Sequence, residues 1–203
     1  MAAHPHPRLT PDQYLELERT APYKSEYFDG IMYAMPGVSW QHALITANLA
    51  RELGNRLKGT SCAAVTSDMR VRIGIGGLFA YPDIVVVCDQ PGFTDAHVDT
   101  LLNPQLLVEV LSPSTEAYDR GFKSQQYRTL ESLQEYALAS QTEPRIEVFR
   151  RHSGTQWVLT EFAGLESACR LDSLNVSIPL ADIYDKVVFQ GEPPLVPPAS
   201  MPA

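Results

Sequence analysis

With 203 residues and 44% hydrophobic side chains, the chain can bury one good core, so a single domain is expected. A formal net charge of −8 argues against nonspecific attraction to phosphate backbones, and any nucleic-acid contact must then use a local basic patch. The three cysteines, Cys62, Cys88 and Cys169, have no metal-ligand spacing, and such an odd, scattered set predicts no disulfide framework and three small buried side chains.

The ends of the chain carry few structural signals. No apolar stretch is long enough to span a bilayer, and the first residues lack the apolar core of a secretory signal, so a cytoplasmic location is expected. We expect a flexible N-terminus over residues 1–8, one domain over 9–189 and a proline-rich mobile tail over 190–203.

The first elements are a helix and a hairpin. Thr10 with Pro11 and Gln13 is typical of an N-cap with a capping box, which predicts a helix from 11 to about 19. Asp29-Gly30 then predicts a tight hairpin turn between strands at about 24–28 and 31–35.

A longer amphipathic helix follows the hairpin. Ser39 is placed to cap it, and Gly59 to end it. Its apolar stripe consists of Ile45, Leu49, Leu53 and Leu57.

The remaining elements are mostly strands. A helix is expected over about 119–130, where Phe122, Gln126, Tyr127 and Leu130 have helical spacing. A flexible turn is expected at 74–77, and a short helix near 180–184 closes the domain. Strands are expected at 62–66, 69–73, 84–87 and 106–110, and a C-terminal meander at 135–139, 145–150, 156–162 and 168–171.

Two carboxylates lie inside apolar runs that look like buried strands. Asp83 begins the run 81–88, and Glu109 lies near the end of the run 104–112. Two acids on neighbouring buried strands repel each other unless a cation or a shared proton compensates. This pattern favours a hard-metal site, with strand capping by Asp83 and an ion pair between Glu109 and Lys123 as the simpler structural alternative.

An ordered series of motifs contains these acids. It consists of Pro82-Asp83, then Glu109-Val110-Leu111-Ser112-Pro113-Ser114, then Tyr118-Asp119-Arg120-Gly121-Phe122-Lys123 and Tyr127. The series resembles the Uma family of restriction-endonuclease-like proteins, a branch of the PD-(D/E)xK nucleases. The resemblance extends back to Tyr27-Phe28-Asp29-Gly30 and His42 and forward to Asp182-Ile183-Tyr184, so it covers nearly all but the two tails.

The resemblance implies an α/β (α+β) fold. Its core would be a restriction-endonuclease-like mixed β-sheet flanked by helices, with an N-terminal helix and hairpin and the C-terminal meander. In that fold the strands of Asp83 and Glu109 are adjacent. Both carboxylates and the carbonyl of Val110 would then bind Mg²⁺ or Mn²⁺.

The chain departs from the parent motif at Leu111, where a lysine is expected. We expect Lys123, on the crossover helix, to replace it in stabilising charge on the phosphate, with Tyr127 on the same helix face. The alternative is a surface lysine paired with Asp119.

Three further residues have two readings each. Glu26 either adds a ligand or orients a metal-bound water, or is an exposed strand acid. His42 either contacts phosphate or acts as an acid, or is a core histidine on the apolar stripe. Asp68 is either a turn former or an acid that faces Asp83.

Besides Lys123, seven basic residues are candidates for a local phosphate-binding patch. The alternative is that they lie on solvated helix and strand faces. They are Arg70 and Arg72, Arg120 and Arg128, and Arg51, Arg56 and Lys58.

The leading functional prediction is a divalent-metal-dependent endonuclease that hydrolyses DNA and acts as a homodimer, because a dimer pools two basic patches. The rival is a catalytically silent binding or assembly module with the same fold. A metal hydrolase for a small phosphorylated substrate is a third reading.

Overall fold

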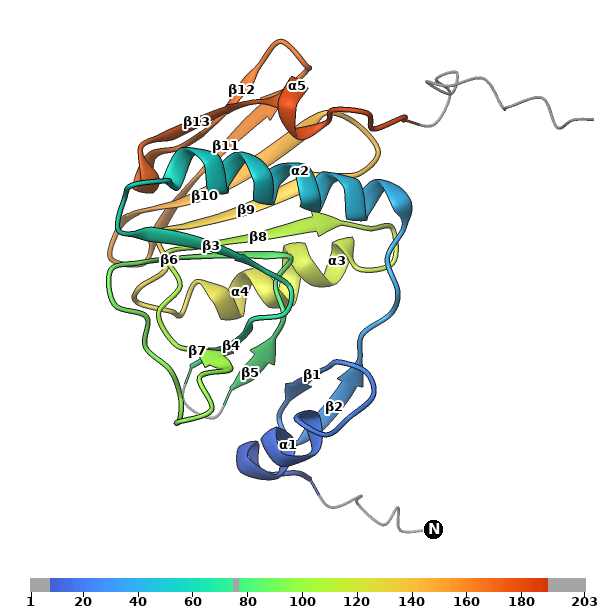
Figure 1. The fold of residues 1–203 in the computed structure, drawn as a ribbon, viewed down its shortest axis with the longest axis vertical. Coiled ribbons are helices and arrows are strands. Elements are labelled where there is room, and N and C mark those ends of the chain that lie inside the picture. Colours follow the sequence, from blue (N-terminus) through green and yellow to red (C-terminus); the bar gives the residue numbers. More distant parts are fainter. Residues whose placement is uncertain (1–7, 75–76, 190–203) are drawn as a thin grey trace, which may run out of the picture.

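The computed structural model of the chain describes residues 8–74 and 77–189. A mixed six-stranded sheet forms its centre (Figure 1). In spatial order its strands are β11 (Gln156–Ala163), β10 (Arg145–Ser153), β9 (Glu135–Ser140), β8 (Leu106–Leu111), β6 (Ile84–Cys88) and β3 (Cys62–Thr66). Within this sheet only β8 and β9 pair in parallel, because the chain crosses over between them through a helical segment.

A second sheet of five strands and a two-stranded sheet complete the β-structure. The five strands are, in order, β2 (Ile31–Ala34), β1 (Ser25–Phe28), β5 (Leu78–Ala80), β4 (Arg70–Ile73) and β7 (Thr100–Leu101). The pair consists of β12 (Ala168–Leu171) and β13 (Val176–Pro179). The helices are α1 (Pro11–Glu18), α2 (Trp40–Leu57), α3 (Glu116–Tyr118), α4 (Ser124–Tyr127) and α5 (Leu180–Ile183), with a π-helix η1 (Asp119–Lys123) and a 3-10 turn η2 (Asp172–Leu174).

The central strands β6, β8 and β9 of the six-stranded sheet are covered on both faces, as the apolar runs of β6 and β8 predicted. Along β8 the residues alternate between two cores: Leu106, Val108 and Val110 face α2 and α5, whereas Leu107 and Leu111 face the five-stranded sheet and α4. In Figure 1, α2 runs along one side of this sheet, and α3 and α4 lie beside β8. By the same alternation, Glu109 belongs to the face that carries the crossover helices.

Local signals placed the first elements correctly. Thr10 and Gln13 form the predicted capping box of α1. Asp29 and Gly30 have φ angles of 48° and 84°, which is the geometry of the tight hairpin turn between β1 and β2. Ser39 accepts a hydrogen bond from the backbone N–H of His42 and so caps α2.

The sequence reading missed three strands, β5, β7 and β13, and assigned β12 to the meander. β5 and β7 have three and two residues, too few to show a periodic pattern. β12 leaves the meander because its partner is β13 and not β11. The meander therefore ends with β11.

The expected crossover helix over 119–130 begins earlier and is not a uniform α-helix. It starts at Glu116, widens into the π-helix η1 and ends as α4 at Tyr127. π-helical turns are rare and are frequently found at functional sites. Asp119 and Lys123, the two ends of η1, are both buried.

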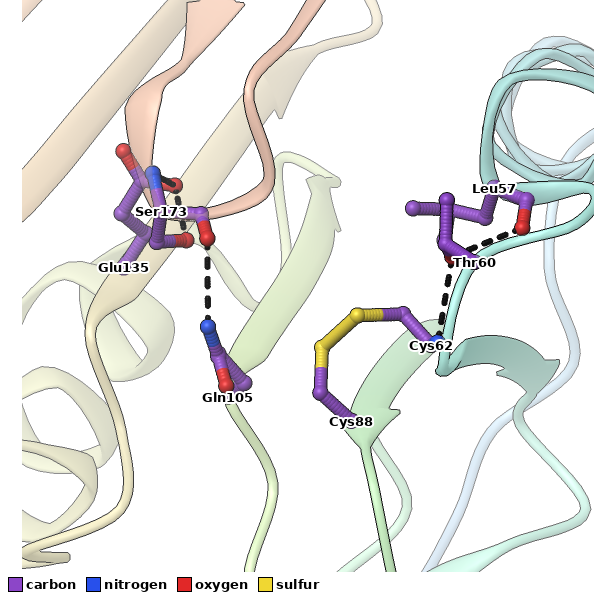
Figure 2. Close-up of a disulfide and its surroundings, with 7 residues drawn as sticks. All are labelled: Leu57, Thr60, Cys62, Cys88, Gln105, Glu135 and Ser173. Carbon is purple, nitrogen blue, oxygen red and sulfur yellow. Dashed lines mark hydrogen bonds between the residues drawn. A yellow bond between two sulfur atoms is a disulfide. The ribbon is translucent and has the colours of Figure 1, made fainter.

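The prediction of no disulfide and three buried thiols was wrong for two of the cysteines. Cys62 and Cys88 lie opposite each other on the antiparallel strands β3 and β6 and form a disulfide, shown in Figure 2 beside Thr60 and Leu57. Both are partly exposed. Their separation of 26 residues in sequence hid a pairing that only the strand register creates. Cys169 is a buried free thiol, as predicted.

Within the described ranges, none of the helices is long and apolar enough to cross a membrane. The predicted flexible N-terminus, residues 1–8, lies outside the described residues except for Arg8, and the predicted mobile tail, residues 190–203, lies wholly outside them. Two of the four residues of the turn predicted at 74–77 also lie outside them.

Candidate active site

Asp83 and Glu109 come together at one end of the strand pair β6–β8. Ile84 lies opposite Val108 in this antiparallel pair, so the register carried one residue further places Asp83 opposite Glu109. Side chains of directly opposed residues lie on the same side of a sheet. Both carboxylates line one cavity of about 300 Å³. The predicted adjacency of the two strands is therefore confirmed.

Lys123 lies at the centre of an acidic cluster. Its Nζ is 2.9 Å from Oε1 of Glu26, 3.1 Å from Oε1 of Glu109 and 3.4 Å from Oδ1 of Asp119. The Lys123 side chain is only 8% exposed. The alternative of a surface lysine is wrong, although the pairing with Asp119 that it invoked is present. Glu26 is likewise buried, so it is not the exposed strand acid.

The phenol of Tyr127 completes the shell around Glu109. Its hydroxyl donates a hydrogen bond of 2.7 Å to Oε1 of Glu109, the oxygen that also faces Lys123. Lys123 and Tyr127 are four residues apart and reach the same carboxylate, as their spacing predicted.

Burial makes the ionised form of these acids costly. It raises the pKa of Glu109 to about 8, because the loss of hydration and the nearby negative charges of Asp119, Asp83 and Glu26 outweigh the attraction of Lys123. Burial also raises the pKa of Asp119 above its ordinary value. The pKa of Lys123 is raised well above its ordinary value, because the surrounding carboxylates outweigh the effect of its burial. One ammonium thus faces several carboxylates, and a further cation would reduce the repulsion among them.

Asp83 is held by groups from two other elements. Its Oδ2 accepts a hydrogen bond of 2.7 Å from the backbone N–H of Val110 and lies 3.2 Å from Nε2 of His42. His42 is in the first turn of α2, and its Nδ1 is buried without a hydrogen-bond partner among the described residues. His42 is therefore buried at the N-terminal end of α2 and also contacts Asp83 of the site.

The bonds described leave one oxygen of each carboxylate for another ligand. Lys123 and Tyr127 engage Oε1 of Glu109, and Val110 and His42 engage Oδ2 of Asp83. No hydrogen bond of the described residues uses Oε2 of Glu109 or Oδ1 of Asp83. Two carboxylate oxygens at one cavity, beside an excess of negative charge, fit a hard divalent cation.

The donor set for such a cation is small. Among the described residues, no group of three or more His, Cys, Asp or Glu side chains is arranged to hold a metal. Val110 lines the same cavity. Two carboxylates and the Val110 carbonyl would leave the remaining positions of an octahedral Mg²⁺ or Mn²⁺ to water and substrate, which is typical of magnesium sites.

Asp68 does not join the site. It lies in the turn between β3 and β4, where the backbone N–H of Met69 bonds to the carbonyl of Thr66. Its side chain is 87% exposed and pairs with Lys24. The reading as a turn former holds.

Most of the basic residues considered for a phosphate-binding patch are engaged within the fold. Arg70 is 3% exposed and its Nη2 lies 3.1 Å from Oδ2 of Asp99. Arg120 bonds to Glu116 at 2.7 Å. Arg51 and Arg56 both pair with Glu52. Among the described residues, Lys123 is the lysine or arginine that lines the cavity of Asp83 and Glu109.

Sequence reasoning did not anticipate Asp119 or Tyr118 as part of the site. Asp119 was considered only as a surface partner of Lys123, and the aromatic ring of Tyr118 lies 5.5 Å from Lys123 Nζ. A search for acids four residues before a candidate lysine would have found Asp119. The position of Tyr118 depends on the π-helix, for which the sequence carries no local signal.

The chain is similar to known proteins over most of its length. The profile of the family described as "Uma2: Putative restriction endonuclease" matches residues 11–181. Two curated relatives come from Synechocystis sp.: uncharacterized protein slr1290, 36% identical over 93% of this chain and 100% of its own length, and uncharacterized protein sll1609, 37% identical over 77% of this chain and 88% of its own.

A solved structure extends the likeness to the fold. The crystal structure of a putative nuclease belonging to DUF820 from Anabaena variabilis superposes with a TM-score of 0.71 at 18% identity. The match covers 89% of this chain and 99% of the other. The predicted restriction-endonuclease-like fold is thereby confirmed.

Proposed function

The chain belongs to the Uma2 family of putative restriction endonucleases, and we propose that it is a divalent-metal-dependent endonuclease that hydrolyses phosphodiester bonds of DNA. The observation that carries this proposal is the pair Asp83 and Glu109, whose carboxylates line one cavity and each have one oxygen that no hydrogen bond of the described residues uses.

Asp83, Glu109 and the carbonyl of Val110 would hold Mg²⁺ or Mn²⁺. When bound, such an ion lowers the pKa of a coordinated water and offsets charge that develops on the phosphate. The chain's own contribution is to fix the two carboxylates. His42 and the Val110 N–H orient Asp83, and Tyr127 orients Glu109.

Lys123 would serve as the electrostatic donor in place of the lysine that Leu111 displaces. Its ammonium lies on the cavity wall and is held by Glu26, Glu109 and Asp119. A cation held by Asp83 and Glu109 would offset part of that negative charge and so weaken the attraction of these acids for Lys123. The ammonium would then be able to turn toward a phosphate oxygen. Glu26 would keep the lysine charged and close to the site in the meantime.

A catalytically silent binding module remains the second candidate, and one observation favours it. Lys123 has three N–H donors, and three carboxylates already lie within 3.4 Å of its Nζ. If these pairs persist when nucleic acid binds, Lys123 is a structural ion-pair partner and stabilises no transition state.

Cleavage of supercoiled plasmid DNA with Mg²⁺ or Mn²⁺, against the same reaction in EDTA, distinguishes the two candidates. The endonuclease proposal expects metal-dependent nicking that Asp83→Asn and Glu109→Gln abolish and that Asp68→Asn, a surface acid of the same type, leaves unchanged. Wild-type protein that binds metal but nicks no DNA would leave the silent module as the better account.

We also propose a homodimer, since an acidic protein gains from pooling two sites when both strands of an acidic polymer must be cut. Light scattering at micromolar concentration is expected to give twice the mass of the chain. A monomer there would remove the simplest route to double-strand cleavage.

A further inference from the structure

A second and larger cavity adjoins the candidate active site. It has a volume of about 550 Å³, within the range of roughly 300–1,000 Å³ that small-ligand pockets occupy. We call it the aromatic chamber, because four aromatic residues line it: Phe28, Tyr33, Tyr118 and Phe122. It shares Met35, Pro36, Ser114, Thr115 and Lys123 with the cavity of the two carboxylates, so the two spaces meet along that wall.

The charge inside the aromatic chamber is balanced. Its charged lining residues are Glu26 and Lys123, which pair with each other at 2.9 Å. A phosphate group would meet the Glu26 carboxylate and a lysine that is already paired, whereas a neutral group meets no such opposition. The chamber therefore suits an uncharged ligand, and the neighbouring cavity suits the cation and the phosphate.

The aromatic rings are arranged to receive a flat group. Phe122 stacks on Tyr118 with ring centres 5.4 Å apart and meets Phe28 edge-on at 4.6 Å. Tyr33, on β2, is 49% exposed at the rim. An exposed tyrosine beside ordered rings leaves an aromatic surface on which a further ring can stack. Ser114 and Thr115 also line the chamber. Their hydroxyls lie 3.1 and 2.9 Å from the hydroxyl of Ser112, and each keeps capacity for a further hydrogen bond to a polar ring edge.

A flat, neutral ring with a polar edge, joined to a phosphate, is a nucleobase of a nucleic acid. We propose that the aromatic chamber binds one unpaired nucleobase of the DNA, next to the phosphate held at Asp83 and Glu109. This proposal rests on the proposed function, because the phosphate site is what brings DNA to the chamber.

The proposal narrows the substrate class. A base inside a duplex reaches such a chamber only after it is unstacked and unpaired, which costs a few kcal/mol and costs least where the base is already unpaired. The preferred substrates would then be DNA with a bulge, a mismatch or a single-stranded segment at the scissile phosphate. Fully paired duplex DNA would be a poor substrate.

The test compares three fluorescent duplexes of equal length by anisotropy in calcium buffer: one fully paired, one with a single bulged adenine, and one with an abasic bulge. The last two share the same backbone and differ only in the base. We expect wild-type protein to bind the adenine bulge about 5- to 150-fold more tightly than the abasic bulge, the range that corresponds to roughly 1–3 kcal/mol for one stacked base.

Two variants and a control locate the effect. Tyr33→Ala changes an exposed rim residue, and Phe122→Leu shortens the inner wall; each should reduce the preference for the adenine bulge at least several-fold. Tyr23→Ala is the matched control, because Tyr23 is 61% exposed and does not line the chamber. It should keep the full preference. Thermal melting shows which variants remain folded. If Phe122→Leu does not fold, the base preference of Tyr33→Ala alone is enough to test the proposal.

Equal affinity for the two bulges, no binding of any probe, or an equal loss in Tyr23→Ala would overturn the proposal. A second copy of the chain could instead cover the chamber; Tyr33→Ala would then convert dimers to monomers without changing base preference, which also overturns it. Metal-dependent cleavage without base preference would remove only this inference. A base preference without any cleavage would support it and remove only the endonuclease activity.

Discussion

Replacement of Lys123 by methionine tests the charge balance of the candidate site. Methionine keeps much of the length of the lysine side chain and removes its charge. Glu26, Glu109 and Asp119 would then face one another without their shared cation, from which they lie 2.9, 3.1 and 3.4 Å away. Removing one partner of a buried ion pair typically costs about 3–5 kcal/mol of unfolding free energy.

The destabilisation by Lys123→Met should depend strongly on pH. Without the ammonium the buried carboxyls bind protons more tightly in the folded state, and each proton so retained lowers stability by about 1.4 kcal/mol per pH unit as the pH rises. At pH 5 the carboxyls are neutralised by protons and the loss should be small, under about 2 kcal/mol, whereas at pH 8 the full loss of ~3–5 kcal/mol is expected.

Urea unfolding followed by circular dichroism, in EDTA at pH 5 and pH 8, measures both values. Lys24→Met serves as the control, because Lys24 pairs with Asp68 at the surface, with side chains 40% and 87% exposed. Its loss should stay within about 1 kcal/mol at either pH, as is typical of surface pairs. A Lys123→Met variant that loses the same stability at both pH values, or no more than Lys24→Met, would refute the charge balance described here.

Three further outcomes are expected. Asp83→Asn should abolish Mn²⁺ binding measured by titration calorimetry, while Asp68→Asn binds as the wild type does; retained binding in the first variant would exclude Asp83 as a ligand. In metal-free buffer the pKa of Glu109 is raised from 4.5 to about 8, so its contribution to stability is complete below pH 4.5 and is lost as the pH rises through 8. Glu109→Gln should flatten the dependence of the melting temperature on pH over that window, and an unchanged slope would contradict the assignment. Replacing Cys62 and Cys88 by alanine should lower the unfolding free energy by ~3–4 kcal/mol from loop entropy over 26 residues, and equal stability of wild type and variant under non-reducing conditions would show that the disulfide does not form.

Local chemistry determined much of the fold from the sequence alone. The capping box at Thr10, the Asp29-Gly30 turn and the Ser39 cap each act over a few neighbouring residues, so their effects are visible without a partner. The longer buried strands β6 and β8 were equally clear, because a strand covered on both faces needs a continuous apolar run. Asp83 and Glu109 were recognised within the same runs, since an acidic residue is easily identified where the neighbouring side chains are apolar.

Only the tertiary structure decided the features that depend on distant pairing. The disulfide between Cys62 and Cys88 depends on the register of β3 and β6. The strands β5, β7 and β13 could not be recognised from the sequence, because they are short or are defined by the strand with which they pair. The contact of Lys123 with Glu26 of β1 joins two elements that lie far apart in the sequence, and the π-helix η1, which ends at Lys123, was not predicted. The sequence showed which residue types could form the site, whereas the balance of one ammonium against several buried carboxylates is fixed by packing, because burial and charge separation are properties of the folded chain.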